Sequence, residues 1–123
     1  MKGLKFRVWD IERECYLDET ELAGVTPDGK YILYIEEEEI SKLEIEGNYI
    51  IEQYTSLKDK NGKEIYEGDL VAYEKNNIAS VRFEYGGFYP FVEPYNDFDC
   101  PSGKEVEVIG NIHELNMEKK EEE

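Results

Sequence analysis

The sequence predicts a mainly β protein whose C-terminal half has the strand spacing of a small barrel. Three observations support this prediction: apolar runs are short and rich in β-branched or aromatic residues, turn residues separate them, and the chain has material for one modest core. Of its 123 residues, 40% are hydrophobic and 13% aromatic. A disordered chain is disfavoured despite a formal net charge of -16.

The first predicted strand lies in the run KFRVWD. Phe6 and Val8 share one face of an extended segment, and Lys5, Arg7 and Trp9 share the other. This alternation predicts a strand that is buried on one face only.

Two further strands are predicted in the N-terminal half, with an ambiguous segment between them. Residues 27–29 are Pro-Asp-Gly, a turn signal, and the apolar run 31–35 follows as a strand. In residues 36–44 the apolar spacing fits both a helical turn and a strand, and the Glu and Lys content suits a short helix, so both alternatives stay open. Residues 47–48 suggest a turn before a strand at 49–54.

The C-terminal half has the clearest strand pattern. Asn-Asn, Gly-Gly and Pro-Ser-Gly breaks separate short runs of β-branched and aromatic residues, a spacing typical of small barrels. The predicted strands are 70–73, 79–85, 88–92 and 105–109.

The run VRFEYGGFYPFV is the best hairpin candidate. Gly86 and Gly87 can take the positive φ angles of a tight turn. Pro90 lacks the N–H that a ladder needs, so the returning strand is expected at an edge or with a bulge. The pattern divides the chain into a β-rich segment at 1–53 that can include a short helix, a barrel at 54–115 and an acidic disordered tail at 116–123.

The run YTSLKDKNGKEIYEGDLV, residues 54–71, is the most tightly specified stretch of the chain. Gly62 completes an Asn-Gly turn, and Gly68 permits a second bend without a Cβ penalty. Asp69 can accept hydrogen bonds from nearby backbone amides. We therefore interpret these three residues as a structural corner that begins a strand.

The run KFRVWD near the N-terminus, QYTSLKDKNGKEIYEGDLV in the middle and VIGNIHE near the C-terminus together resemble the YopX family of bacteriophage and prophage proteins. The resemblance covers nearly the whole chain, with Ser56 standing where the family commonly has glycine. It implies a mainly β protein with a C-terminal SH3-like barrel, a phage or prophage origin and action in the bacterial host cytoplasm. It implies no established activity, because the family is uncharacterised.

The sequence favours no catalytic, cofactor or metal site. His113 is the single histidine, and no third residue supports a pairing with Cys15 or Cys100, which we expect to be reduced and partly buried. The run DFDC at 97–100 supplies carboxylates and a thiol without a second ligand cluster. The sequence contains no GxxxxGK pattern, which would mark a phosphate-binding loop. We therefore expect a protein that is not an enzyme and holds no cofactor.

The charge balance bears mainly on partners. Thirty acidic residues against 14 basic ones repel phosphate backbones, so direct nucleic-acid binding is unlikely. No apolar stretch is long enough for a membrane span, and the N-terminus does not resemble a secretory signal. The expected location is the cytoplasm.

These observations favour a noncatalytic interaction module that binds a host or phage protein or forms a homo-oligomer. Exposed rings contribute strongly to protein interfaces, and an aromatic-rich segment near the predicted hairpin could supply them. The candidate interaction surface comprises Tyr85, Phe88, Tyr89, Phe91 and Tyr95. Since strands alternate, about half of these rings are expected to fill the barrel instead.

The alternative is a nucleic-acid-linked role. Lys58, Lys60 and Lys63, with Tyr54 and Tyr66 nearby, could bind single strands weakly. With the opposite electrostatics, the acidic chain could mimic nucleic acid and occupy a host protein's binding surface.

Overall fold

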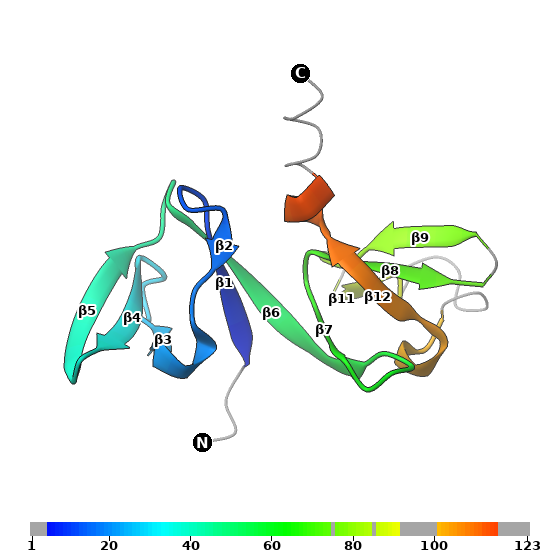
Figure 1. The fold of residues 1–123 in the computed structure, drawn as a ribbon, viewed down its shortest axis with the longest axis horizontal. Coiled ribbons are helices and arrows are strands. Elements are labelled where there is room, and N and C mark those ends of the chain that lie inside the picture. Colours follow the sequence, from blue (N-terminus) through cyan, green and yellow to red (C-terminus); the bar gives the residue numbers. More distant parts are fainter. Residues whose placement is uncertain (1–4, 75, 85, 92–100, 116–123) are drawn as a thin grey trace. The chain divides into compact units, whose positions relative to one another are not determined.

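The computed structural model describes residues 5–74, 76–84, 86–91 and 101–115. It is mainly β, with twelve strands among these residues, which confirms the predicted class. The chain divides into two compact units. We call Phe6–Glu52 the N-terminal unit, and Lys5 together with the described residues from Gln53 to Leu115 the C-terminal unit. The division falls within strand β6, Tyr49–Lys58 (Figure 1).

Strand β1, Phe6–Asp10, lies between β2, Cys15–Tyr16, and β6 in one sheet. The prediction that only one face of β1 is buried is wrong, because Val8, Trp9 and Asp10 are all buried. The Trp9 ring packs edge-on against the Tyr16 ring, with centroids 4.9 Å apart. On the second face, the Trp9 ring is thus covered in part by Tyr16 of the neighbouring strand β2, which is too short for its pattern to be recognised in the sequence.

A second sheet of the N-terminal unit has the order β3-β4-β5, with strands Leu22–Val25, Tyr31–Glu36 and Glu39–Glu44. A single 3-10 turn, Glu19–Glu21, precedes it. The ambiguous segment is thus a strand, paired with β4 from Tyr31↔Glu44 to Glu36↔Glu39. Its six ladder pairs outweigh the helix propensity of Glu and Lys, which is a weak preference.

The N-terminal unit contains a buried ion pair beside its small apolar core. Glu52 is 3% exposed and accepts hydrogen bonds from Arg7 Nε at 2.7 Å and from the Tyr16 hydroxyl at 2.8 Å. The Arg7 guanidinium also lies 4.5 Å from the centroid of the Tyr16 ring. Val8 and Ile32 are fully buried. This unit is therefore held together by a charge cluster as well as by apolar packing.

The C-terminal unit contains a sheet of order β12-β8-β9. These strands are Glu107–Asn111, Asp69–Tyr73 and Asn77–Ser80, and β7, Glu64–Tyr66, pairs with β6. The buried cluster of this unit consists of Ile65, Val71, Ala79, Val81 and Val106. A 3-10 turn, Gly103–Glu105, precedes β12, so this strand begins two residues later than predicted.

The predicted hairpin is present as β10, Arg82–Glu84, and β11, Gly87–Tyr89, with Phe83 opposite Phe88. The predicted strand at 79–85 is interrupted, because β9 ends before Val81. Val81 is buried and exchanges two backbone hydrogen bonds with Gly68 and Asp69. Pro90 lies beyond the end of β11 and is buried. The tail predicted at 116–123 lies outside the described residues.

Ser56 occupies a backbone conformation that favours glycine. Its φ is 71°, and the register of β6 with β7 shifts between Tyr54 and Lys58, as in a bulge. A Cβ costs roughly 1–2 kcal/mol in the left-handed region. This geometry explains why a glycine suits the position where this chain carries serine.

We expect Ser56→Gly to raise the free energy of unfolding by about 0.5–1 kcal/mol, because relief of the left-handed strain exceeds the extra entropy of an unfolded glycine. Chemical denaturation followed by circular dichroism measures the change. The control is Ser80→Gly in β9, where φ is not positive and the same exchange should destabilise. Equal destabilisation by both substitutions would contradict the expectation.

Candidate interaction sites

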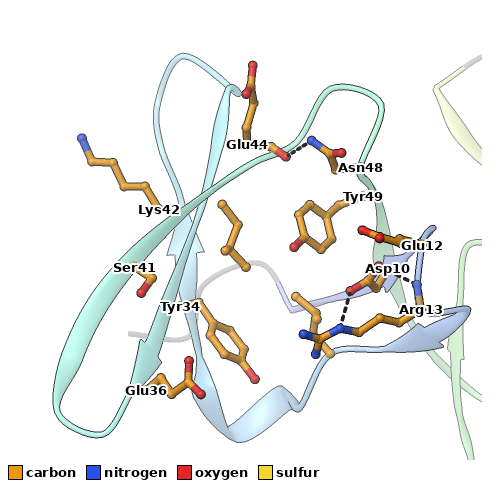
Figure 2. A pocket seen from close by; sticks show the side chains of 12 residues that line it. Asp10, Glu12, Arg13, Tyr34, Glu36, Ser41, Lys42, Glu44, Asn48 and Tyr49 are labelled. Carbon is orange, nitrogen blue, oxygen red and sulfur yellow. Dashed lines mark hydrogen bonds and ion pairs between the residues drawn. The ribbon is translucent and has the colours of Figure 1, made fainter.

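The N-terminal unit contains a polar cavity of about 410 Å³. Figure 2 shows it between the β4–β5 hairpin and the segment that carries Asp10, with the Tyr34 and Tyr49 rings inside. Residues from the end of β1, from the β1–β2 turn, from the position after β2, from the β4–β5 hairpin and from the start of β6 with the residue before it line the cavity. They are Asp10, Glu12, Arg13, Leu17, Tyr34, Glu36, Ser41, Lys42, Leu43, Glu44, Asn48 and Tyr49.

Asp10 and Arg13 form one wall of the cavity. Asp10 is buried, and its Oδ1 accepts a hydrogen bond from the Arg13 backbone N–H at 3.0 Å. Its Oδ2 lies 3.9 Å from Arg13 Nε (Figure 2). Across the β1–β2 turn, Glu14 N–H donates to the Asp10 carbonyl at 2.9 Å. The turn thereby fixes the Asp10 carboxylate at the end of β1, whereas the Arg13 side chain is 79% exposed.

The two tyrosines of the cavity are neutral at physiological pH. The hydrogen bond between the Tyr34 hydroxyl and the Glu21 carboxylate raises the pKa of Tyr34 to about 12, with burial and the charge of Glu36 adding to the effect. Burial, followed by the negative charge of Asp10, raises the pKa of Tyr49. Both hydroxyls are therefore hydrogen-bonding groups, and neither is prepared to act as a general base.

Negative charge dominates the cavity lining. Asp10, Glu12, Glu36 and Glu44 stand against two cations of the lining, Arg13, which lies 3.9 Å from Asp10, and Lys42, whose Nζ lies 5.6 Å from the centroid of the Tyr31 ring. Within the described part of the chain, no cation pairs with Glu12 or Glu36. Their charges nevertheless reach the cavity interior, since Glu36 contributes to the raised pKa of Tyr34 and Glu12 to that of Tyr49. The cavity is thus suited to a cationic group.

A second hollow, the lysine groove, lies in the C-terminal unit and has a volume of about 600 Å³. Lys58, Lys60 and Lys104 line it together with neighbouring backbone and small side chains, which are Ser56, Leu57, Asp59, Gly62, Ser102 and Gly103. Gly103 is buried, and a Cβ there would lie 2.7 Å from the Lys58 carbonyl oxygen. Only glycine permits this approach of the 3-10 turn to the end of β6.

Asp59 organises the corner that carries two of these lysines. Asp59 is 4% exposed, and its Oδ1 accepts backbone hydrogen bonds from Asn61 and Lys63, both at 2.9 Å. Its Oδ2 accepts from the Val108 N–H of β12 at 3.0 Å. Burial acts to raise the pKa of Asp59, but the hydrogen bonds from Val108, Lys63 and Asn61 outweigh burial and hold the pKa below its ordinary value.

Of the corner residues singled out from the sequence, Gly62 contacts Asp59, because its N–H donates to the Asp59 carbonyl at 3.0 Å. Gly62 and Gly68 have φ angles of 81° and 86°, which favour glycine. Asp69 is buried, and its Oδ2 accepts a hydrogen bond from the Tyr66 backbone N–H at 2.8 Å. Asp59 was not singled out, although the pattern Asp-Lys-Asn-Gly is typical of a carboxylate that caps its own turn.

The structure divides the predicted aromatic surface. Phe88, Tyr89 and Phe91 are half-buried and pack against the buried cluster of the C-terminal unit. Tyr85 and Tyr95 lie outside the described residues. Phe83, which the prediction omitted, is 54% exposed and contacts Phe88 edge-on, with ring centroids 5.1 Å apart.

The residues proposed for single-strand binding do not form one site. Lys58 and Lys60 line the groove, whereas Lys63 does not. The Tyr54 and Tyr66 rings pack against each other, with centroids 5.4 Å apart, and Tyr66 is buried. No stacking platform of these two rings is therefore available beside the lysines.

The residues considered for catalysis belong to different units. His113 is buried in a helical turn at 112–115 of the C-terminal unit. Cys15 belongs to the N-terminal unit and is exposed, so its expected partial burial is wrong, and Cys100 with the run DFDC lies outside the described residues. Among the residues that the structure describes, no three potential metal ligands gather, and no helix is long and apolar enough to cross a membrane.

The comparisons with known proteins agree with the sequence resemblance. A family model described as YopX protein matches residues 5–117. The crystal structure of protein EF1440 from Enterococcus faecalis is similar, with a TM-score of 0.58 and 25% identity, and the match covers 93% of this chain and 96% of that chain. No curated protein matches.

Proposed function

The chain belongs to the YopX family, and on this premise we propose that it is a noncatalytic interaction module that binds a protein partner through the polar cavity of its N-terminal unit. The partner inserts a lysine or arginine side chain between Tyr34 and Glu12.

In this proposal the protein is a phage or prophage accessory protein that acts in the bacterial host cytoplasm. Its C-terminal unit is an SH3-like barrel, a proposal supported by the short antiparallel strands around one buried cluster.

The observation that carries the proposal is the unbalanced charge of the cavity. Glu12 and Glu36 have no cationic partner within the described residues and lie near two neutral tyrosine hydroxyls. A guanidinium has five N–H donors and an ammonium has three, so the carboxylates and hydroxyls can satisfy either head group. The aromatic faces of Tyr34 and Tyr49 suit a cation as well.

The raised pKa values of the two tyrosines support a binding role over a catalytic one. A hydroxyl whose pKa is about 12, as for Tyr34, stays protonated throughout the physiological range. The cavity residues include neither histidine nor cysteine. Binding by preformed polar groups is thus the chemistry that these side chains serve best.

The test compares Glu12→Gln/Glu36→Gln with a matched control, Glu19→Gln/Glu46→Gln. All four residues are exposed glutamates of the N-terminal unit, but the control pair lies outside the cavity lining. Each tagged protein captures partners from bacterial host lysate, and the recovered protein is purified and titrated by calorimetry. We expect the cavity pair to weaken binding about tenfold or more, which corresponds to about 1.4 kcal/mol, and the control pair to bind as the original chain does.

A direct titration keeps the cavity assignment separate from the partner's identity. Capped arginine amide and capped lysine amide are added to isotope-labelled protein, and nuclear magnetic resonance follows the rings of Tyr34 and Tyr49. Their resonances should shift with the cationic amides and not with capped glutamine amide. Equal shifts with all three, or none at millimolar ligand, would overturn the proposed role of the cavity.

A further inference from the structure

We propose that the lysine groove of one copy binds the acidic tip of the β4–β5 hairpin of a second copy. The acidic tip comprises Glu37, Glu38 and Glu39, which are exposed. The groove lies in the C-terminal unit and the tip in the N-terminal unit, so the contact is independent of the cavity. Each copy offers both halves of the interface.

The lysine groove concentrates positive charge in an otherwise acidic chain. The chain has 14 basic residues against 30 acidic ones, yet three lysines converge on this one hollow. Lys58 and Lys104 have no ion pair within the described residues, and Lys60 makes one exposed contact of 3.4 Å with Glu107. An exposed pair of this kind contributes little to stability, so it leaves Lys60 able to pair with an anionic ligand instead.

Close packing and buried hydrogen bonds hold the residues of the groove in place. Gly103 fits against Leu57 and Lys58 at a distance that no larger residue tolerates, and Leu57 packs on the buried cluster of the unit. The three hydrogen bonds accepted by Asp59 fix the backbone between Lys58 and Lys60. The backbone that carries Lys58 and Lys60 is therefore anchored to the packed interior of the C-terminal unit.

The hairpin tip has the complementary chemistry. Its two-residue turn places Glu37 and Glu38 at φ angles of 50° and 70°, where Asn-Gly is the preferred pair. Behind the carboxylates, Ile35 and Ile40 face each other across the strands and are 41% and 68% exposed. Carboxylates beside an apolar pair are complementary to a groove lined by three lysines and Leu57.

A second copy is favoured over a nucleic acid as the occupant. A net charge of -16 repels a polyphosphate along its whole length, whereas the tip is a short and local concentration of negative charge. The Tyr54 and Tyr66 rings pack against each other, and base stacking would need free faces. Because groove and tip are different surfaces, the contact is heterologous and joins copies head to tail.

The experiment is a charge exchange read by light scattering on the full chain at rising concentration. One variant, Lys58→Glu/Lys104→Glu, reverses the groove, another, Glu37→Lys/Glu38→Lys, reverses the tip, and a third carries all four substitutions. The original chain should show a mass above that of the monomer. Each pair alone should weaken association about tenfold or more, and the fourfold variant should regain it.

General charge repulsion makes a different prediction. Reversal of the tip makes the chain less negative, so relief of repulsion alone would strengthen association, whereas the proposed contact requires it to weaken. The fourfold variant keeps the net charge of -16 and serves as the matched control. Monomeric behaviour of the original chain at millimolar concentration, or stronger association of the tip variant, would overturn the proposal.

The same proteins test the competing occupant. Fluorescently labelled single-stranded DNA of twelve or so thymidines is titrated with the original chain and with the groove variant at low salt. We expect no binding to either. Binding that disappears in the groove variant would assign the lysines to phosphates and overturn the proposed contact between copies.

Discussion

Glu52→Gln is expected to lower the free energy of unfolding of the N-terminal unit by about 3 kcal/mol. Glu52 is 3% exposed, and Arg7, its partner at 2.7 Å, has a side chain that is 12% exposed. A neutral amide at position 52 removes the negative charge that lies 2.7 Å from this largely buried guanidinium. Breaking a buried pair from one side typically costs about 3–5 kcal/mol.

The single tryptophan of the chain makes this loss measurable. Trp9 is buried in the same unit, and its ring contacts Tyr16, which also donates a hydrogen bond to Glu52. Trp9 fluorescence during urea denaturation should therefore show a lower midpoint for Glu52→Gln. Glu46→Gln, an exposed change of the same chemistry in the same unit, should leave the midpoint in place.

A third variant separates the charge from the packing. Arg7→Met/Tyr16→Phe/Glu52→Leu removes the three polar groups together and keeps similar volumes. Replacing a buried pair by well-packed apolar residues is often neutral or stabilising, so this protein should be more stable than Glu52→Gln. If it is less stable, the cluster contributes through its hydrogen bonds and its ring contact rather than through charge compensation.

Local pattern predicted the short strands and the hairpin of the C-terminal unit because these features depend on neighbours in sequence. The Gly86-Gly87 turn and the alternation before it led to β10 and β11 with Phe83 opposite Phe88. The interruption at Val81 could not be foreseen. It depends on hydrogen bonds to Gly68 and Asp69, which the chain brings there from a different strand.

The N-terminal unit was harder to predict because its sequence supports competing structures. Residues 36–44 contain good helix formers, but residues 39–44 form a strand because they pair with β4. Arg7 looked like an outward residue of β1, yet it is the partner of Glu52, which lies far along the chain. A charged residue that is buried with a partner is assigned to the surface when the sequence pattern alone is considered.

The candidate sites illustrate the same limit. The cavity combines β1, the β4–β5 hairpin and the start of β6, and no short motif marks such a combination. Lys58 and Lys60 were noticed as neighbours, but Lys104 joins them only through the close approach at Gly103. The sequence pattern indicates a Pro-Ser-Gly break and an Asp-Lys-Asn-Gly turn, but it does not indicate that the two segments contact each other.

Asp59→Asn should destabilise the C-terminal unit by about 3 kcal/mol. The carboxylate accepts three backbone hydrogen bonds that link the corner at 59–63 to β12. An asparagine amide has one acceptor oxygen, and its NH₂ group would face a backbone N–H instead of accepting from it. Hydrogen bonds to a buried charged group contribute about 1.5–3 kcal/mol each, and an unsatisfied buried donor adds a cost.

Amide hydrogen exchange locates this effect. The N–H groups of Lys63 and Val108 should exchange faster in Asp59→Asn, whereas Trp9 fluorescence should report an unchanged transition of the N-terminal unit. Asp28→Asn provides the control, since Asp28 accepts from the Lys30 N–H in an exposed turn of the other unit. Unchanged exchange at Val108 would show that the carboxylate does not secure β12.

The pH dependence follows from the lowered pKa of Asp59. Since this carboxyl has a pKa below the ordinary value of 3.8 in the folded protein, its charged form is favoured by folding. Its contribution is complete well above pH 3.8 and is lost as the pH falls from there through the lower folded pKa. The stability difference between the original chain and Asp59→Asn should therefore be constant at neutral pH and narrow in acid. A difference that instead widens on acidification would mean that the folded protein favours the protonated carboxyl, and the role assigned to the three hydrogen bonds would be wrong.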